Sequence, residues 1–276
     1  MNAIDNLMID AVKGKIKTIG GNMELQHLSS RLPEKQTLQT TPFLDLQPMT
    51  DRDKTVMERI CEIIPSSHEI RMFKCPLVVR GGVVHIYGEV PDDGSRRRIR
   101  KILSCIKGVN AVWDMLTLPG EERLKIIDIG CGGNKQVPWA LGVDKYPCAG
   151  VDVVTDLEDM LPFKDNEVDQ VFAVHVLEHI HDIIGLMNEI HRVLKPDGML
   201  HVLSPVSTSA NSIADPTHVR LFSSQTFKYF CRQNAGVYPF NPVSISQDAW
   251  NVYADVYPVK GNNKLLTKEE LSYYFD

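Results

Sequence analysis

The stretch KIIDIGCGGNK, residues 125–135, decides the fold of the larger part of this 276-residue chain. Its first half, residues 125–129, is the continuous apolar run that is typical of a buried parallel strand. Three glycines, Gly130, Gly132 and Gly133, follow directly. A glycine loop behind a strand lets backbone amides approach a ligand closely. We therefore expect an α/β fold with a binding loop at the carboxyl edge of an open sheet.

The glycine loop does not fit the two commonest nucleotide-binding patterns. The dinucleotide fingerprint G-x-G-x-x-G needs a third glycine where Lys135 stands, which disfavours NAD binding. The chain also lacks a G-x-x-x-x-G-K-S/T phosphate loop. A nucleotide-dependent oxidoreductase remains open as a rival function, and it would bind NAD(H).

An ordered series of short apolar runs follows the loop. We expect strands at residues 140–143, 151–154, 169–174 and 199–203. Near the end of the chain, a strand within residues 247–260 is expected to supply an antiparallel edge pair. An amphipathic helix precedes the strand at 199–203, with one apolar face made of Ile180, Ile183, Ile184, Met187, Ile190, Val193 and Leu194. Residues 195–198, Lys-Pro-Asp-Gly, are expected to end that helix. Because residues 130–142 are too few for a full crossover, the first crossover helix should be short or absent.

Residues 125 to about 232 resemble a class I S-adenosylmethionine-dependent methyltransferase of the type 11 group. The resemblance is carried by four blocks and their spacing: DIGCGGNK (128–135), GVD (142–144), TDLEDMLPFKDNEVDQVFAVHVLEHI (155–180) and EIHRVLKPDGML (189–200). It implies a Rossmann-like methyltransferase sheet with helices on both faces. It also implies S-adenosyl-L-methionine as the cofactor.

The resemblance assigns cofactor contacts to the glycine loop and the strand after it. Gly130, Cys131 and Gly132 would pack against the methionine part of the cofactor, and Asp128 would help to hold the loop. Asp144 would accept hydrogen bonds from the ribose hydroxyls. Taken without the resemblance, Asp144 could equally be a helix cap or a turn residue, and Cys131 a small packing residue.

Later strand ends complete the implied cofactor site. Asp156 with Leu157 would face the adenine, where a carboxylate suits the exocyclic amine. Val174 and His175 would line the methionine end beside the transferred methyl group.

Four residues are candidates for acceptor chemistry: His175, His179, Asp215 and His218. The last two belong to the segment D-P-T-H-V-R-L-F, residues 215–222, which we expect above the cofactor, where acceptors enter. Either could remove a proton from an acceptor within hydrogen-bond reach. The alternatives are structural: Glu178 and His179 opening a helix, Asp215 capping a turn and His218 bonding backbone. No metal site is expected.

Residues 50–119 form a separate unit with the order helix, hairpin, helix, strand. Thr50 should cap the first helix, Gly81-Gly82 should turn the hairpin, and Ser95 should cap the second helix. The stretches VVRGGVVHIYGEV (78–90) and GVNAVWDML (108–116) resemble the BON domain family, small α+β modules. That resemblance implies a binding role, commonly at phospholipid surfaces.

The second helix of this unit is strongly basic between residues 96 and 107. Its six cations are Arg96, Arg97, Arg98, Arg100, Lys101 and Lys107. This face could bind an anionic surface or partner. The alternative is a solvated face opposite the isoleucine stripe, which is favoured because no aromatic residues interleave with the charges.

The remaining features concern location. Residues 1–49 are predicted to be a flexible N-terminal arm or linker, within which residues 3–18 could form a short amphipathic helix. The unit at 50–119 follows, and the methyltransferase-like domain occupies residues 120–276. The N-terminus lacks the order of a secretory signal, and no apolar run reaches the ~20 residues of a transmembrane segment. Six cysteines without a C-x-x-C pair fit reduced thiols. We expect a cytoplasmic protein.

Together these patterns favour a methyltransferase that modifies an oxygen or nitrogen of a small-molecule, glycan or lipid acceptor. Duplex DNA is not expected, because His175-Val176-Leu177 replaces the N/D-P-P-Y/F motif of amino-methylating DNA enzymes, and the net charge is −5. Two alternatives remain open: a non-catalytic cofactor-binding scaffold, and a methyltransferase acting on a protein.

Overall fold

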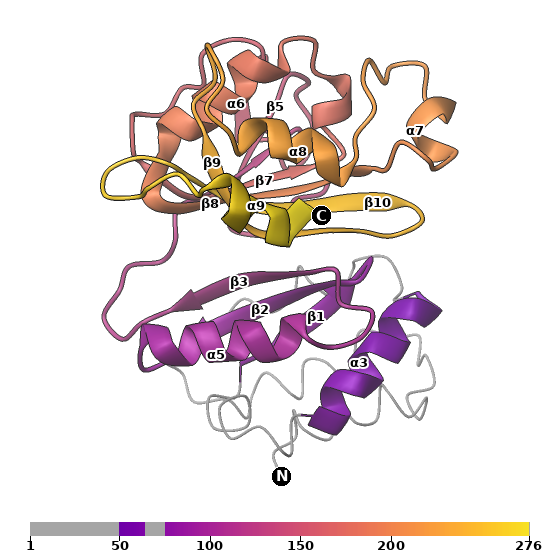
Figure 1. Ribbon diagram of the computed structural model, residues 1–276, viewed down its shortest axis with the longest axis vertical. Coiled ribbons are helices and arrows are strands. Elements are labelled where there is room, and N and C mark those ends of the chain that lie inside the picture. Colours follow the sequence, from indigo (N-terminus) through magenta and orange to yellow (C-terminus); the bar gives the residue numbers. More distant parts are fainter. Residues whose placement is uncertain (1–49, 64–74, 276) are drawn as a thin grey trace.

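Two β-sheets, one of three strands and one of seven, face each other in the computed structural model (Figure 1). The structure describes residues 50–63 and 75–275. The expected arm at residues 1–49, with its optional helix, lies outside the described residues. Within the described ranges, no helix is both long and apolar enough to cross a bilayer.

The small sheet has the predicted order of elements. They are α3 (Asp51–Ile63), β1 (Leu77–Arg80), β2 (Val83–Glu89), α5 (Asp93–Ser104) and β3 (Ala111–Thr117). Strands β1 and β2 are antiparallel around Gly81 and Gly82, which both have positive φ, and β3 runs parallel to β2. The predicted cap of the first helix is confirmed, because the Thr50 hydroxyl accepts the Asp53 N–H at 3.1 Å.

Helix α5 begins earlier than predicted. The side chain of Asp92 accepts the Ser95 N–H at 2.8 Å, so Asp92 is the cap and the prediction of Ser95 is wrong. The Asp-Asp-Gly turn supplies the helix start because aspartate is as good a cap as serine. The helix also ends at Ser104, which leaves Lys107 beyond it.

The large sheet has the strand order β6-β5-β4-β7-β8-β10-β9. Its strands are β4 (Ile126–Ile129), β5 (Leu141–Asp144), β6 (Val153–Val154), β7 (Val168–Val174), β8 (Leu194–Pro205), β9 (Phe240–Gln247) and β10 (Asn251–Pro258). Strands β4 to β8 are parallel, and β10 is antiparallel to both of its neighbours. The chain order reverses between β4 and β7, which makes this a Rossmann-like sheet with its ligand crevice at that switch point.

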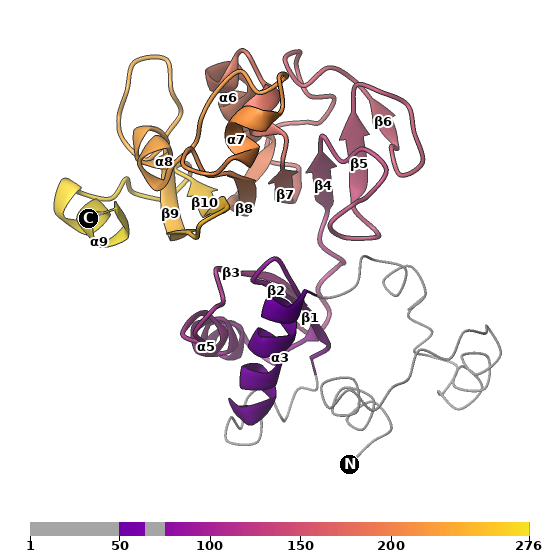
Figure 2. The ribbon, with the colours of Figure 1, turned by 90° about the vertical axis from the view of Figure 1, so that its right-hand side faces the viewer.

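Among the residues that the structure describes, helices pack on only one face of the large sheet. They are α6 (Ile183–Val193), α8 (Ser224–Phe230) and α9 (Lys268–Phe275), with the short η2 (Leu177–His179) and α7 (Asn211–Ala214) near the carboxyl edge of the strands (Figure 2). The predicted short or absent first crossover helix is confirmed, because residues 130–140 form turns only. Helix α6 starts at Ile183, later than expected, and Ile184 is exposed.

The expectation of helices on both faces is therefore wrong for the described chain. The second face of the large sheet packs against the small sheet, and their side chains form one core (Figure 1). Trp113 of β3 lies at its centre with 1% exposure, 5.1 Å from the Phe172 ring of β7 between ring centroids. The small sheet occupies the place that crossover helices would cover, so the two sequence units are packed as one body.

Buried charges join the two sheets. Asp255 of β10 accepts hydrogen bonds from Trp113 Nε1 at 3.1 Å and from His201 Nδ1 at 2.7 Å. Asp114 of β3 pairs with Arg96 Nε at 2.7 Å and with Arg100 at 3.4 Å. Two cations of the basic helix thus neutralise a buried carboxylate. The other four, Arg97, Arg98, Lys101 and Lys107, stay exposed.

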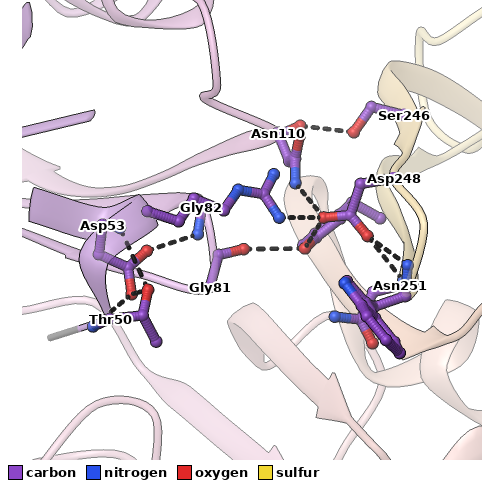
Figure 3. A network of polar contacts seen from close by, with 11 residues as sticks. Thr50, Asp53, Gly81, Gly82, Asn110, Ser246, Asp248 and Asn251 are labelled. Carbon is purple, nitrogen blue, oxygen red and sulfur yellow. Dashed lines mark hydrogen bonds and ion pairs between the residues drawn. The ribbon is translucent and has the colours of Figure 1, made fainter. Parts of the chain in front are cut away.

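A second polar network joins the glycine turn of the small sheet to the β9–β10 hairpin (Figure 3). Asp248 is its hub: Arg52, the Asn110 amide at 2.8 Å and the Tyr253 hydroxyl at 3.0 Å all contact its Oδ2. Tyr253 also donates to the Gly81 carbonyl at 2.8 Å. The network crosses between sheets at a point where the apolar core ends.

Replacing Asp248 by alanine should therefore destabilise the fold. The substitution leaves Arg52, Asn110 and part of the hairpin turn without their acceptor, at a cost of about 2 kcal/mol. Urea denaturation compares it with Asp197→Ala, which removes an exposed aspartate. Equal midpoints for the two variants would contradict the role of this network.

Candidate functional site

The glycine loop after β4 is shaped by two positions with left-handed backbone. Gly130 has φ 61°, and a Cβ there would lie 2.7 Å from Val176 Cβ. Gly132 has φ 50°, and a Cβ there would meet nothing within 4 Å. The loop is thus held tightly at Gly130 and open at Gly132. An open backbone at this edge fits the approach of the cofactor that the sequence implies.

The acidic residues at the strand ends hold the loops in place. The Asp144 carboxylate accepts the Gly132 N–H at 2.9 Å, which ties the end of β5 to the glycine loop. Asp156 is exposed and accepts the Glu158 N–H at 3.0 Å. The Leu157 side chain is buried in the core, so only its backbone is available to an adenine. The expected contact of Asp156 and Leu157 with the adenine stays a prediction.

Asp128 lies buried beneath the loop. Its carboxyl group accepts the backbone N–H of Gln136, which connects the strand to the far end of the loop. Burial raises the pKa of Asp128 to about 7. Cys131 is also buried, and burial raises the pKa of its thiol to about 11, as expected for a packing residue.

The raised pKa of Asp128 predicts a pH dependence of stability. Between pH 4 and 7 the folded state keeps a proton that the unfolded state loses, so stability falls as the pH rises. From pH 5 to 8 the free energy of unfolding should fall by about 2–3 kcal/mol more in the wild type than in Asp128→Asn. Chemical denaturation of both proteins at the two pH values measures this difference, and parallel curves would refute it.

A cleft of about 600 Å³ opens beyond the carboxyl ends of β7 and β8. Its lining residues come from both strand ends, η2 and the segment after β8: His175, Glu178, His179, Pro205, Asn211, Ala214, Asp215, Pro216 and His218. All four candidates for acceptor chemistry are among them. The structure thus brings together residues from two separate parts of the chain.

His175 connects this cleft to the cofactor loop. Val174 ends β7 and His175 follows it, directly before the Val176 that packs on Gly130. His175 has φ 53°, a conformation that is costly for a non-glycine residue and that clusters at functional sites. Its Nδ1 lies 3.5 Å from Glu178 Oε1.

The segment 215–222 is fastened over η2 by its own motif residues. The Val219 N–H donates to the Glu178 carbonyl at 2.9 Å. The Arg220 guanidinium donates to the carbonyls of Ile180 at 3.0 Å and His181 at 2.7 Å. These bonds hold the neighbouring His218 in the cleft. They explain why valine and arginine follow the histidine in the D-P-T-H-V-R motif.

Hydrogen bonds orient two of the three imidazoles of the cleft, those of His179 and His218. Thr217 Oγ1 lies 2.9 Å from His179 Nδ1 and 2.6 Å from Asp215 Oδ1. His218 Nδ1 lies 3.0 Å from the Ser212 carbonyl oxygen. Hydrogen bonds from Thr217 lower the pKa of Asp215 below its usual value. Asp215 is thus a weaker base than expected and acts on His179 through Thr217.

Glu178 is the residue that sequence reasoning missed. It was interpreted only as the start of a helix, yet its side chain is 2% exposed and lies in the cleft wall. Oε2 accepts the Ser204 hydroxyl at 3.0 Å, while Oε1 has no hydrogen-bond partner in the structure. Its position in the sequence, three residues after His175 and directly before His179, was the signal that could have identified Glu178 as a site residue.

Comparison with known proteins assigns the central part of the large sheet. Residues 127–202 match the Methyltransf_11 family, described as a methyltransferase domain. Cycloartenol-C-24-methyltransferase 1 of Oryza sativa subsp. japonica is 27% identical over 129 residues, 38% of each chain. Sterol 24-C-methyltransferase erg6 of Aspergillus fumigatus is 38% identical over 61 residues, 22% of this chain and 16% of that protein. The matched segment is similar to a methyltransferase domain, and S-adenosylmethionine is the cofactor of such domains.

These matches are partial. The uncharacterized protein YafE of Escherichia coli is 32% identical over 76 residues, 24% of this chain and 37% of that protein. The chain thus spans well under half the length of these relatives. A solved SAM-dependent methyltransferase from Thermotoga maritima, a possible histamine N-methyltransferase, aligns with a TM-score of 0.40 and 18% identity, covering 50% of this chain and 84% of that one.

Proposed function

We propose that this protein is an S-adenosylmethionine-dependent methyltransferase whose acceptor is an oxygen or nitrogen of a small molecule, glycan or lipid headgroup. The observation that carries the proposal is the cleft at the end of β7, which joins the glycine loop through Val176 and His175. The relatives that act on sterols methylate carbon, as their names say. The charged and imidazole lining of this cleft favours a polar acceptor instead.

Different residues of the chain would bind the cofactor and act on the acceptor. The bound cofactor supplies an electrophilic methyl group on a sulfonium. Gly132 and Asp144 would hold the cofactor beside the end of β7. His218, with Nδ1 committed to the Ser212 carbonyl, presents Nε2 as a base for the acceptor proton. Positioning of the two reactants supplies most of the rate.

Calorimetry with S-adenosylmethionine and its demethylated product tests the cofactor half of the proposal. The wild type and the exposed-site control Asp197→Ala should bind both, and Asp144→Ala should lose at least about tenfold in affinity, one charge-assisted hydrogen-bond pair. No binding by the wild type would overturn the proposal. Binding of NAD(H) in its place would favour the oxidoreductase.

Labelled cofactor and fractionated cell extract test the acceptor half. Label in a small-molecule, glycan or lipid fraction is the expected result, and loss of that label in His218→Ala would place the base. Label in protein would support the protein methyltransferase instead. Cofactor binding without any transfer would support the non-catalytic scaffold.

The small domain is proposed as a BON-like binding module. Its element order and the exposed cations Arg97, Arg98 and Lys101 on α5 support contact with an anionic surface. Binding to vesicles with and without phosphatidylserine tests this, and equal binding to both would refute it.

A further inference from the structure

We propose that Glu178, His179 and His218 form a binding site for a divalent transition-metal cation in the acceptor cleft. Each residue offers one ligand atom, and these atoms all lie within 4.8 Å of one another. Bonds of about 2.0–2.1 Å to imidazole nitrogen and carboxylate oxygen require only small side-chain movements from this arrangement. The site lies among residues that line the cleft, so a bound cation would face the acceptor.

In both His179 and His218 the hydrogen bonds engage Nδ1, which leaves Nε2 free to bind a metal. The Ser212 carbonyl can only accept, so His218 Nδ1 carries the proton and Nε2 carries the lone pair. The Thr217 hydroxyl donates to Asp215 at 2.6 Å, so His179 Nδ1 must donate to that hydroxyl. Both histidines thus have Nδ1 held by a second layer of acceptors and Nε2 left for a metal, the usual arrangement around a metal.

The carboxylate gives an independent sign of a missing ligand. Glu178 is 2% exposed, and its Oε1 lies in the cleft without a hydrogen-bond partner. A buried acceptor left unpaired costs about 1–3 kcal/mol. A cation bound by Oε1 would remove that cost. His175, with Nδ1 3.5 Å from Oε1, lies near enough to become a further ligand.

Two imidazoles and one carboxylate favour zinc, cobalt, manganese or iron over calcium. Three protein ligands leave coordination positions open, as in catalytic rather than structural sites. Here the inference rests on the proposed function and revises one role in it: with the cation on Nε2, His218 would be a ligand and not the base. The open position would bind the acceptor oxygen and lower its pKa, so that the acceptor proton passes to solvent water before the oxygen attacks the methyl group. The binding site itself does not depend on that function.

Cobalt(II) titration of the full chain, after treatment with a chelator, tests the site. The wild type should bind one equivalent with visible d–d absorption, and zinc should displace it. Glu178→Gln and His218→Ala should lose this signal. Thr217→Val removes the hydroxyl partner of His179 Nδ1 and leaves only the Thr217 carbonyl at 3.3 Å, so it should weaken binding about 10-fold. His181→Ala is the matched control, because His181 is 75% exposed and its Nδ1 faces Glu158.

Cofactor binding measured on the same samples separates the two proposals. Cobalt binding that depends on Glu178 and His218, without any S-adenosylmethionine binding, would support the site and refute the proposed function. Cofactor binding without stoichiometric cobalt would overturn the metal site alone. Cobalt binding that survives in both Glu178→Gln and His218→Ala would also overturn it.

Discussion

Replacing Trp113 by alanine is expected to lower the free energy of unfolding by about 3–5 kcal/mol, the cost of deleting a buried aromatic side chain. Trp113 belongs to the small sheet, yet its ring lies 5.1 Å from Phe172 and 5.6 Å from His201 of the large sheet, between centroids. Its loss opens a cavity between the two sheets. It also removes the Nε1 donor from Asp255, which is 1% exposed.

The same packing predicts that both sheets unfold together. The shared core contains Val83, Ala111 and Met115 from one side and Ile126 and Tyr253 from the other. Opening it exposes apolar surface on both sheets at once. The wild type should therefore show one transition, and Trp113→Ala should shift the whole of it.

Urea denaturation followed by far-ultraviolet circular dichroism measures the shift. Trp250→Ala is the matched control, because Trp250 is 55% exposed and its loss should cost little. Trp113→Phe keeps a ring but loses the donor, and should lie between the two. A Trp113→Ala protein as stable as the control, or two separate transitions in the wild type, would refute the shared core.

The sequence was sufficient for six strands of the large sheet, all but β9, although not for all of their limits. The apolar runs predicted at 140–143 and 169–174 became β5 and β7 within a residue. Residues 195–198 were expected to end the preceding helix, and α6 does end directly before them, at Val193. They are counted within β8, but the pairing with β7 passes from Leu194 directly to Met199. The Lys-Pro-Asp-Gly segment thus forms an irregularity in the ladder, which agrees with the local turn preference of proline and glycine.

Strand β9 (Phe240–Gln247) could not be recognised locally. Only the partner strand was expected, from residues 247–260. Pro242 interrupts the apolar pattern, and proline is tolerated only where a strand lacks a neighbour or is bulged. Strand β9 is at the edge of the sheet and has a register shift beside Pro242. Both conditions are properties of the whole sheet.

The packing of the small sheet on the large sheet could not be predicted from the sequence either. Apolar patterns show which residues are buried but not which surface buries them. The absent first crossover helix was predictable from chain length, since residues 130–140 are too few. That the small sheet fills the vacated face was not, because Trp113 and Phe172 lie in separate units of the sequence.

The candidate site shows the same limit. The four acceptor candidates were predicted from position after strands, and they do share a cleft. Glu178 was missed because a carboxylate before a helix has a sufficient local explanation. Its burial, and the lack of a hydrogen bond at Oε1, arise only when β8 and the segment after it close over η2.

Gly130→Ala should abolish cofactor binding, lowering affinity by about 100-fold or more, roughly 3 kcal/mol. Two independent effects act at this position. An alanine would be strained at φ 61° by about 1 kcal/mol or more, and its Cβ would overlap the Val176 side chain. Relief requires the loop to move away from β7, which pulls Gly132 and the adjoining His175 out of place together.

Gly133→Ala is the matched control, because Gly133 has no left-handed backbone and a Cβ there would lie 3.7 Å from the Ala149 carbonyl oxygen, an ordinary contact. Calorimetry with S-adenosylmethionine compares the two variants with the wild type. Circular dichroism and thermal unfolding check that Gly130→Ala still folds. Since the clash involves the loop and Val176 rather than Glu178 or His218, cobalt binding should survive in this variant. Wild-type affinity in a folded Gly130→Ala protein would show that the glycine loop does not contact the cofactor.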